Sequence, residues 1–437
     1  MTPEPQYYAQ RLARMIRCKT VSVKGSYDDA EFARLRGVVE ELFPKIHRRM
    51  ERHIFSEDCW VYELEGKDPA RAIVLMSHHD VVAAEGDWEH DPFAGEIIDG
   101  RLWGRGTVDT KTPLFAEFSA LEELLGSGWE PPCTVFLASS HNEELGGDGI
   151  PKALEYFKGR GLTFEAVLDE GGAIIDPPLG GMTCEKCAMV AVHEKGRYKL
   201  NCTASAPSAH TGLTAAAQAS PIERMVGFLR EAAAGEGFVR RLNPQARAMF
   251  AHLALHCRFP MNLVLGNLWL TGPVIRKILP RLNPQAGAML GTVCSFSKIQ
   301  GNGEGCTAVV GFKAVDAVDM EKDLDTLRRM AQKYGVEVEI DPSSEYHGPA
   351  DMRRPAFAYA MERIRAVFPD CPPVPFILPA GTDARWLTEI CPCVLRFAPI
   401  RLSAQQLASV HSENENIDLD AIADAVEFYT DFLRNYK

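Results

Sequence analysis

The chain has 437 residues, of which 46% are apolar, and a formal net charge of −12, from 47 Lys and Arg against 59 Asp and Glu. This length exceeds that of one ordinary domain, so we expect two domains or one domain with a large insertion. The acidic balance argues against nucleic acid and anionic membrane surfaces as partners. No apolar run approaches the roughly 20 residues that span a bilayer, and the N-terminal residues predict an amphipathic helix rather than a secretory signal. We therefore expect a cytoplasmic protein with no nucleic-acid or membrane partner.

The first 190 or so residues alternate strand-like and helical patterns. Three short apolar runs, IVLMSHH, TVFLASS and FEAVLDE, each end in polar or acidic residues. Between the first two, TKTPLFAEFSALEELLGSG has helical periodicity and is closed by glycine. This order predicts an α/β fold whose sheet has parallel crossovers, with polar strand ends that line a crevice where ligands bind.

The pattern changes at about residue 193. There KGRYKLNCTASA alternates like a half-exposed strand, and SPIERMVGFLREAAA predicts a helix. From about residue 356, AFAYAMERIRAVF predicts a helix again, and PFILPAGTDARW and CVLRFAP predict strand-and-loop segments. We therefore predict that residues 193–341 are an inserted α+β domain, and that residues 1–192 and 342–437 together form the α/β domain.

Histidines and acids recur at the predicted strand ends and in two later motifs. Imidazoles and carboxylates together suit zinc or a similar metal better than calcium or magnesium. Five ligands drawn from such a set would be too many for one tetrahedral site, but they would suit two ions, about 3.5–4 Å apart, that share a carboxylate. The candidates are His78, Asp80, Asp109, Glu143, Glu144, Glu170 and His411.

Two neighbouring histidines, His78 and His79, raise the question of which one does chemistry. Side chains two residues apart point to the same face of a strand, so His78 and Asp80 belong together and His79 points away. A carboxylate beside a metal-binding imidazole fixes its tautomer and raises its basicity, which is a coherent role for Asp80. The alternative is that one histidine simply caps the strand end.

The adjacent acids Glu143 and Glu144 follow a predicted buried strand and precede Gly146 and Gly147. One carboxylate could bind a metal while the other takes a proton from a coordinated water. Paired acids on a loop are more often a solvated surface, and the residues themselves do not say which acid has which role.

Twelve cysteines in a long chain without an export signal are expected to be free thiols. The spacings of Cys184–Cys187 and of Cys391–Cys393 suit zinc or redox chemistry, but no further cysteine pairs at finger-like spacing accompany them. We favour a structural role for both pairs, with a redox or structural-metal role as the alternative.

Nine motifs, in order along nearly the whole chain, resemble the zinc-dependent amidohydrolases. That family includes aminoacylase, carboxypeptidase S, carnosinase, succinyl-diaminopimelate desuccinylase and acetylornithine deacetylase, and the motifs here resemble the carboxypeptidase S branch most. The motifs are IRCKTVS, SHHDVV, WEHDPFAGEIIDGRLWGRGTVDTK, HNEELGG, LDEGG, HEKGRYKLNCTASAPSAHTG, AGTDARW, RFAP and HSENE.

The resemblance implies two divalent metal ions, most often zinc, with cobalt or manganese as alternatives. Asp109 would bridge both ions. His78 and Glu170 would complete one site, with Asp169 as the alternative to Glu170, while Glu144 and His411 would complete the other. Glu143 would be the general base, and Asp80 would orient His78.

The resemblance further implies that residues 193–341 form a lid that also mediates homodimerisation. His210 in SAHTG matches a lid histidine that reaches the partner's active site and polarises the scissile carbonyl. Arg385 in GTDAR could bind a substrate carboxylate through its guanidinium, or form a structural salt bridge.

One segment departs from the family pattern. Relatives usually carry GG-x-x-x-N-x-x-P after a lid strand, followed by an arginine. Here the stretch reads GNGEGCTAVVGFKAVDAV, with Cys306, Val309 and Val318 near the asparagine, proline and arginine positions. The change affects the expected substrate contacts rather than the reaction type.

These patterns predict a metal-dependent hydrolase that cleaves an amide bond next to a free carboxylate, in a dipeptide or at the C-terminus of a peptide. Water would lose a proton to Glu143, while a metal and His210 would stabilise the oxyanion. The alternative substrate is an N-acyl amino acid. A member of the fold that binds ligands without catalysis is a third possibility, but it would have no need of an unligated base.

Overall fold

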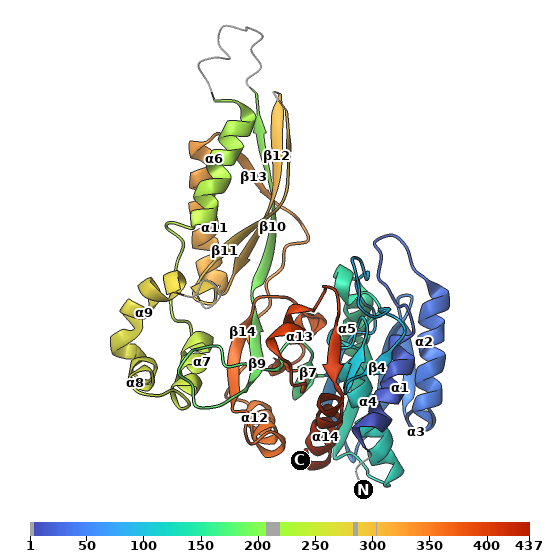
Figure 1. The fold of residues 1–437 in the computed structure, drawn as a ribbon. Coiled ribbons are helices and arrows are strands. Elements are labelled where there is room, and N and C mark those ends of the chain that lie inside the picture. The colour runs from blue at the N-terminus through green and yellow to red at the C-terminus, as the bar shows by residue number, and fades with distance from the viewer. Residues whose placement is uncertain (1–3, 207–218, 283–286, 303) are drawn as a thin grey trace. The chain divides into compact units, whose positions relative to one another are not determined.

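The computed structural model describes residues 4–206, 219–282, 287–302 and 304–437. The chain divides into two compact units, which we describe separately (Figure 1). The first comprises Met1–His193, Leu255–Asn262 and Pro349–Lys437, and the second comprises Glu194–Ala254 and Leu263–Gly348. Among the described residues, no helix has both the length and the apolar character needed to cross a membrane.

The first unit is built around a mixed nine-stranded sheet. Its strand order is β1-β2-β6-β3-β7-β15-β9-β14, with β8 paired to β9. The pairs β3–β6, β3–β7 and β7–β15 are parallel, while β1–β2, β2–β6, β8–β9 and β9–β15 are antiparallel. The strands are β1 (Glu51–Phe55), β2 (Cys59–Leu64), β3 (Asp68–Met76), β6 (Cys133–Ser139), β7 (Ala166–Asp169), β8 (Ile174–Ile175), β9 (Cys187–Glu194), β14 (Pro373–Leu378) and β15 (Val394–Arg396).

The three predicted apolar runs form the parallel centre of this sheet. Every residue of β6 and β7 is buried, as are the last five residues of β3. A strand that is covered on both faces needs such a continuous apolar run, because neither of its faces meets water. The predicted mixed α/β fold is confirmed.

Helices cover this sheet and make the two crossovers between its central strands. Helix α4 leads from β3 to β6 and is buried almost all round, including Phe115 and Phe118, so it lies in the interior rather than at the surface. It packs beside α14, which buries Phe428 and Phe432. The helices are α1 (Pro5–Ile16), α2 (Asp29–Leu42), α3 (Pro44–Arg49), α4 (Lys111–Gly126), α5 (Gly149–Gly159), α12 (Pro355–Val367), α13 (Ala404–Ala408) and α14 (Leu419–Asn435), with short 3-10 helices η1 (Glu143–Leu145) and η2 (Asp383–Glu389).

A small three-stranded antiparallel sheet has the order β16-β5-β4, from β4 (Glu96–Ile98), β5 (Arg101–Trp103) and β16 (Asn416–Asp418). Asn416 pairs with Trp103 in its register. This pairing lays the HSENE motif beside the GRGTVD loop, although the two are about 300 residues apart in the chain.

The second unit contains a four-stranded antiparallel sheet with the order β11-β12-β10-β13. Alternate residues of β10 and β12 are buried, and they pack with apolar residues of α6 and α11 in one core. Ser220 and Glu223 form a capping box at the start of α6. The elements are β10 (Gly196–Ser205), α6 (Pro221–Ala234), α7 (Pro244–Ala254), α9 (Leu268–Leu282), β11 (Val293–Gly301), β12 (Gly305–Ala314), α11 (Ala317–Lys333) and β13 (Glu337–Ile340).

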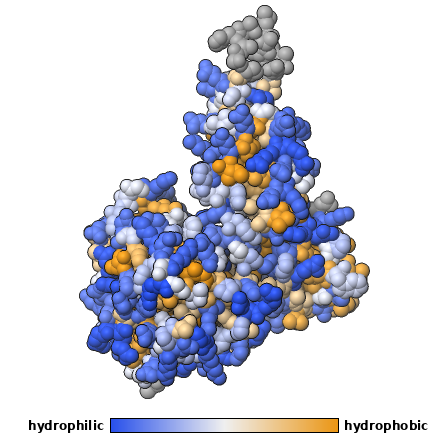
Figure 2. All heavy atoms as spheres, turned by 180° about the vertical axis from the view of Figure 1, so that it is seen from behind, coloured by the Kyte–Doolittle hydropathy of each residue, from blue (hydrophilic) through white to orange (hydrophobic). Residues whose placement is uncertain are grey.

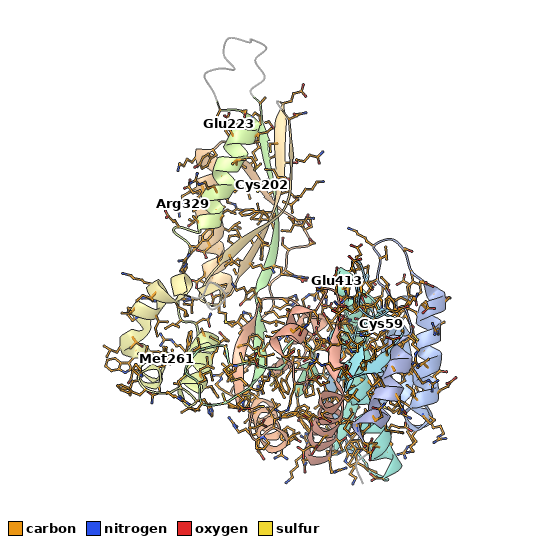
Figure 3. The ribbon with its side chains drawn as sticks, in the orientation of Figure 1. Cys59, Cys202, Glu223, Met261, Arg329 and Glu413 are labelled. Carbon is orange, nitrogen blue, oxygen red and sulfur yellow. The ribbon has the colours of Figure 1, made fainter. Side chains whose placement is uncertain are left out.

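The short segment Leu255–Asn262 belongs to the first unit, although it lies inside the predicted insertion. Backbone hydrogen bonds explain this placement. The N–H of Thr183 donates to the carbonyl of His256 at 2.8 Å, and the N–H of Arg258 donates to the carbonyl of Gly181 at 2.9 Å. Helix α8 (Met261–Gly266) begins at the end of this segment; Met261 is labelled in Figure 3.

Candidate active site

Three predicted site segments follow the carboxyl ends of three neighbouring parallel strands. His78 follows β3, Glu143 and Glu144 follow β6, and Glu170 follows β7. Parallel strands end at one edge of their sheet, so side chains after them converge there, as expected for a ligand site in an α/β sheet.

The carboxylate of Asp109 lies between two imidazoles. Its Oδ1 is 3.0 Å from Nε2 of His78, and its Oδ2 is 3.0 Å from Nε2 of His411. Oε2 of Glu144 is also 3.0 Å from Nε2 of His411. The loop between β5 and α4, the η1 turn and the HSENE motif therefore meet at one point.

His411 has a left-handed backbone with φ of 57°, and so does Asn414 with φ of 60°. Such a conformation costs energy for residues other than glycine and often marks a functional position. Asn414 compensates by accepting a hydrogen bond from the N–H of Glu89 at 2.8 Å through its side chain. Glu413, labelled in Figure 3, similarly accepts from the N–H of Asp87 at 3.0 Å.

Asp80 connects the His78 imidazole to the turn that carries the paired acids. Its Oδ1 is 3.2 Å from Nδ1 of His78 and accepts from the N–H of Glu143 at 3.2 Å. Its Oδ2 accepts from the N–H of Glu144 at 3.2 Å and from the hydroxyl of Ser22. Burial raises the pKa of Asp80, but the hydrogen bond and charge of His78 outweigh it and hold the pKa below its usual value.

His79 points away from this cluster, as the strand geometry predicts. Its ring stacks on Trp60 with centroids 4.0 Å apart, and Nδ1 lies 2.8 Å from the hydroxyl of Ser139. The side chain is fully buried, and burial lowers the pKa of His79. His79 is therefore a packed core residue.

Glu415 organises the loop before Asp109, and the sequence analysis did not single it out. Its Oε1 accepts hydrogen bonds from the N–H groups of Val108 at 2.7 Å and Asp109 at 3.1 Å. Its Oε2 accepts from the N–H of Gly106 at 3.1 Å and from the guanidinium of Arg105 at 2.6 Å. Nothing in HSENE distinguishes Glu415 from the exposed Glu413, because its burial follows from the pairing of β16 with β5.

Asp169 and Glu170, the two candidate acids after β7, have different surroundings. The Asp169 carboxylate accepts from the N–H of Ala384 at 2.9 Å, and burial together with the charge of Asp383 raises the pKa of Asp169 to about 7. Burial, followed by the charge of Asp109, raises the pKa of Glu170 well above its usual value. The Asp169 carboxylate is thus tied to the backbone of η2, whereas the charge of Asp109 acts on Glu170.

Arg385 lies near the η1 turn, whereas His210 lies outside the described residues. The buried Arg385 guanidinium donates to the carbonyl of Thr382 at 2.7 Å and lies 5.1 Å from the ring centroid of Trp386. A Cβ on Gly146 would lie 3.9 Å from its Nη2. Cys306, in the segment that departs from the family pattern, is buried in the core of the second unit.

The donors of His78, Asp109 and Glu144 lie within 4.8 Å of one another, which fits a metal ion. Oε1 of Glu144 is buried and has no hydrogen-bond partner among the residues that the structure describes. Hydrogen bonds that the His411 imidazole donates to the carboxylates of Asp109 and Glu144 raise the pKa of His411 to about 10, although burial opposes them. The site therefore stabilises positive charge and leaves a ligand atom available, as a cation site requires.

Residues 74–435 match the family model of peptidase family M20/M25/M40. The chain belongs to this family. The N-fatty-acyl-amino acid synthase/hydrolase PM20D1 of Xenopus tropicalis is 28% identical over 99% of this chain and 86% of that protein. The probable carboxypeptidase S-like 2 of Dictyostelium discoideum is 27% identical over 98% of this chain and 84% of that protein.

Solved structures of the family share the fold. The M20 family metallo-carboxypeptidase Sso-CP2 from Sulfolobus solfataricus has a TM-score of 0.72 and 18% identity, covering 99% of both chains. The YXEP protein of Bacillus subtilis, a dinuclear metal-binding peptidase of family M20, has a TM-score of 0.60 and 12% identity, covering 98% of both chains. The predicted family, its carboxypeptidase S character, and the metallopeptidase or amidohydrolase class are confirmed.

Proposed function

We propose that this protein hydrolyses an amide bond next to a free carboxylate, in a dipeptide or at the C-terminus of a peptide. The observation that carries the proposal is the Asp109 carboxylate, whose two oxygens each lie 3.0 Å from a different imidazole Nε2. A carboxylate shared in this way suits the bridge between two divalent ions.

Each of the two metal sites would take one imidazole and one further acid beside Asp109. His78 and Glu170 would hold one ion, and His411 and Glu144 the other. Bound divalent ions would polarise the scissile carbonyl and make a water molecule more acidic. We propose zinc, with cobalt and manganese as alternatives, because imidazole and carboxylate ligands suit these metals.

Asp80 would position two participants at once. By contacting Nδ1 of His78, it leaves Nε2 of that ring to face the metal. By accepting from the N–H of Glu143, it fixes the turn that presents the proposed base. Asp80 thus acts through His78 and Glu143 rather than on the substrate.

Glu143 would take a proton from the attacking water and then deliver it to the leaving nitrogen. Burial is the largest factor that raises the pKa of Glu143 well above its usual value, and the charges of Asp383 and Asp80 act in the same direction. A carboxylate with a raised pKa accepts a proton more readily, which is what general-base catalysis requires. Arg385 would bind the substrate carboxylate, and His210 would polarise the carbonyl.

The second unit would serve as the lid and the homodimer contact. Its sheet ends in two edge strands, β11 and β13, and most of β11 is exposed. Unpaired backbone groups on such an edge can pair with a strand of another chain.

We place the protein in the cytoplasm, because all twelve cysteines are free thiols.

A second candidate substrate is an N-acyl amino acid. The observation in its favour is the PM20D1 relative, which matches 99% of this chain and whose name specifies N-fatty-acyl-amino acids. The same machinery would cleave this amide, so the two candidates differ only in the pocket that holds the acyl group.

The deciding experiment measures amino-acid release from a panel of dipeptides and N-acyl amino acids. The chelated protein is assayed before and after zinc, manganese or cobalt is restored. Release that depends on metal supports the proposal, and the part of the panel that is cut identifies the substrate. A protein that binds two ions but releases nothing from any substrate would contradict it and favour a binding role.

A further inference from the structure

The net charge of −12 conceals two regions of opposite sign. Residues 237–303 contain eight Lys and Arg but no Asp or Glu, so they carry +8 and the rest of the chain carries −20. Acids make up 59 of the 437 residues, which makes 67 consecutive residues without one a strong departure. The expectation that this protein avoids anionic membranes rests on the net charge of the whole chain, and residues 237–303 carry the opposite charge.

Helix α9, within this region, exposes large apolar side chains. Trp269 is 78% exposed and Leu270 is 64% exposed, and Val274 and Ile278 are exposed as well. Leu270, Val274 and Ile278 are spaced four residues apart, so they form one stripe along the helix. Orange spheres gather over this part of the chain at the lower right of Figure 2.

The stripe is the outer side of the helix rather than a poorly packed inner side. Gly272 and Ile275 are buried on the opposite side, where a Cβ on Gly272 would lie 3.0 Å from Leu242. The core contact of α9 is thus already made by other residues. Leu270 and Val274 are not part of this contact and are exposed, so they could contact another partner.

Two exposed cations lie on α9, Lys277 within the apolar stripe and Arg276 beside Trp269 at the other edge of the exposed surface. Arg276 follows Trp269 by seven residues and Lys277 follows Leu270 by seven, so each cation lies two turns along from an apolar anchor on the same side of the helix. Neither cation has an ion-pair partner in the part of the chain that the structure describes. By contrast, α6 in the same unit also exposes Ile222 and Val226 but carries Glu223 and Glu231.

We propose that the outer face of α9 docks on the surface of an anionic phospholipid bilayer. Exposed tryptophan and aliphatic side chains enter the headgroup boundary, and neighbouring cations bind anionic headgroups. Helix α9 would lie in the plane of the interface, consistent with the finding that no described helix can span a bilayer. A second copy of the chain is the less suitable occupant, because a two-fold contact through this face would gather two copies of Arg276 and Lys277, and no acid of residues 237–303, in one interface.

The test is flotation of the full-length protein with vesicles of phosphatidylcholine alone or mixed with phosphatidylglycerol. We expect binding to the mixed vesicles that weakens with added salt. Trp269→Glu with Leu270→Glu should lower the partition coefficient by about tenfold or more. Arg276→Glu with Lys277→Glu should do the same for the mixed vesicles, because each cation near an anionic surface contributes about a fivefold gain in binding.

Val226→Glu is the matched control, since it puts the same acid on an exposed apolar position of α6 and should leave binding unchanged. Hydrolysis of a water-soluble substrate should remain at the wild-type level in every variant. If Trp269→Glu with Leu270→Glu fails to fold, the quenching of Trp269 fluorescence by brominated lipid reports the same contact. The Trp269→Phe variant gives the signal of the other tryptophans.

Wild-type protein that ignores both kinds of vesicle would overturn the proposal. So would equal loss of binding in Val226→Glu, because the effect would then not belong to α9. A wild-type oligomer that Trp269→Glu with Leu270→Glu converts to monomers, with no vesicle binding, would assign this face to a second copy.

Discussion

The carboxylate of Glu415 accepts a hydrogen bond from the backbone N–H of Asp109 at 3.1 Å. The same side chain pairs with Arg105 and accepts from the N–H of Val108, while His411 lies four residues before it. One fully buried acid therefore fixes the loop that ends at the proposed bridging ligand and the segment that carries His411. Both are needed for the distance of 3.0 Å between Asp109 and His411.

Glu415→Gln should lower metal affinity or kcat/KM by about 10- to 100-fold, as loss of a residue that orients ligands does. The amide would present N–H groups to the backbone donors and to Arg105 in place of an acceptor. Metal affinity is measured by competition with a chelator. Glu413→Gln is the control, because Glu413 accepts from a different loop, and its activity should stay within about threefold of wild type. Equal behaviour of the two variants would show that Glu415 does not position the site.

Glu143→Ala should remain folded and metal-loaded but lose turnover by about 10²–10⁴-fold, since it removes the proposed general base. The readouts are kcat and bound metal per chain. Glu144→Ala should instead lose metal, because its carboxylate is a proposed ligand. Substantial turnover in Glu143→Ala would refute the assignment of the base.

Asp109→Ala should lose bound metal as well as rate, because both ions would share this carboxylate. Bound metal is measured after dialysis of the purified protein. An Asp109→Ala protein that retained two tightly bound ions would contradict the bridging role.

Replacing His78 and His79 in turn tests which histidine is a metal ligand and which is a packed core residue. His78→Ala should reduce metal binding. His79→Ala should retain metal but lower the free energy of unfolding by about 3 kcal/mol, because it opens a cavity against Trp60 and leaves Ser139 without its imidazole partner. Metal content and urea unfolding of both variants check this. Loss of metal from His79→Ala, with stability unchanged, would reverse the assignment.

Local patterns were enough to predict the sheet and the side on which the site lies. The runs that became β3, β6 and β7 are apolar and end in polar groups, which sets both burial and the location of His78, Glu143 and Glu170. The same-face rule for strands separated His78 from His79 correctly. Such inferences succeed because side-chain direction depends on neighbouring residues alone.

The parts that escaped prediction depend on contacts between distant segments. Glu415 reaches Asp109 only because β16 pairs with β5, which no pattern within HSENE indicates. Similarly, the segment Leu255–Asn262 belongs to the first unit through backbone bonds to residues 181–183, which carry no side-chain signal. The total charge also conceals the distribution of charge, because α9 and its neighbours contribute opposite sign to the sum.

Lys195 should make the stability of the protein depend on pH between about 8 and 10.5. The side chain is buried, its ammonium donates to the carbonyl of Gly291 at 2.9 Å, and burial, with the nearby charge of Lys313, lowers its pKa from 10.5 to about 8. In this window the unfolded chain binds more protons than the folded one, so this group makes the free energy of unfolding rise with pH.

Lys195→Met lacks the group, so wild type should gain stability relative to this variant between pH about 7 and about 10. Urea unfolding at both pH values measures the change, with Lys322→Met, an exposed lysine of α11, as the control. A difference between wild type and Lys195→Met that does not change with pH would show that Lys195 loses no proton on folding.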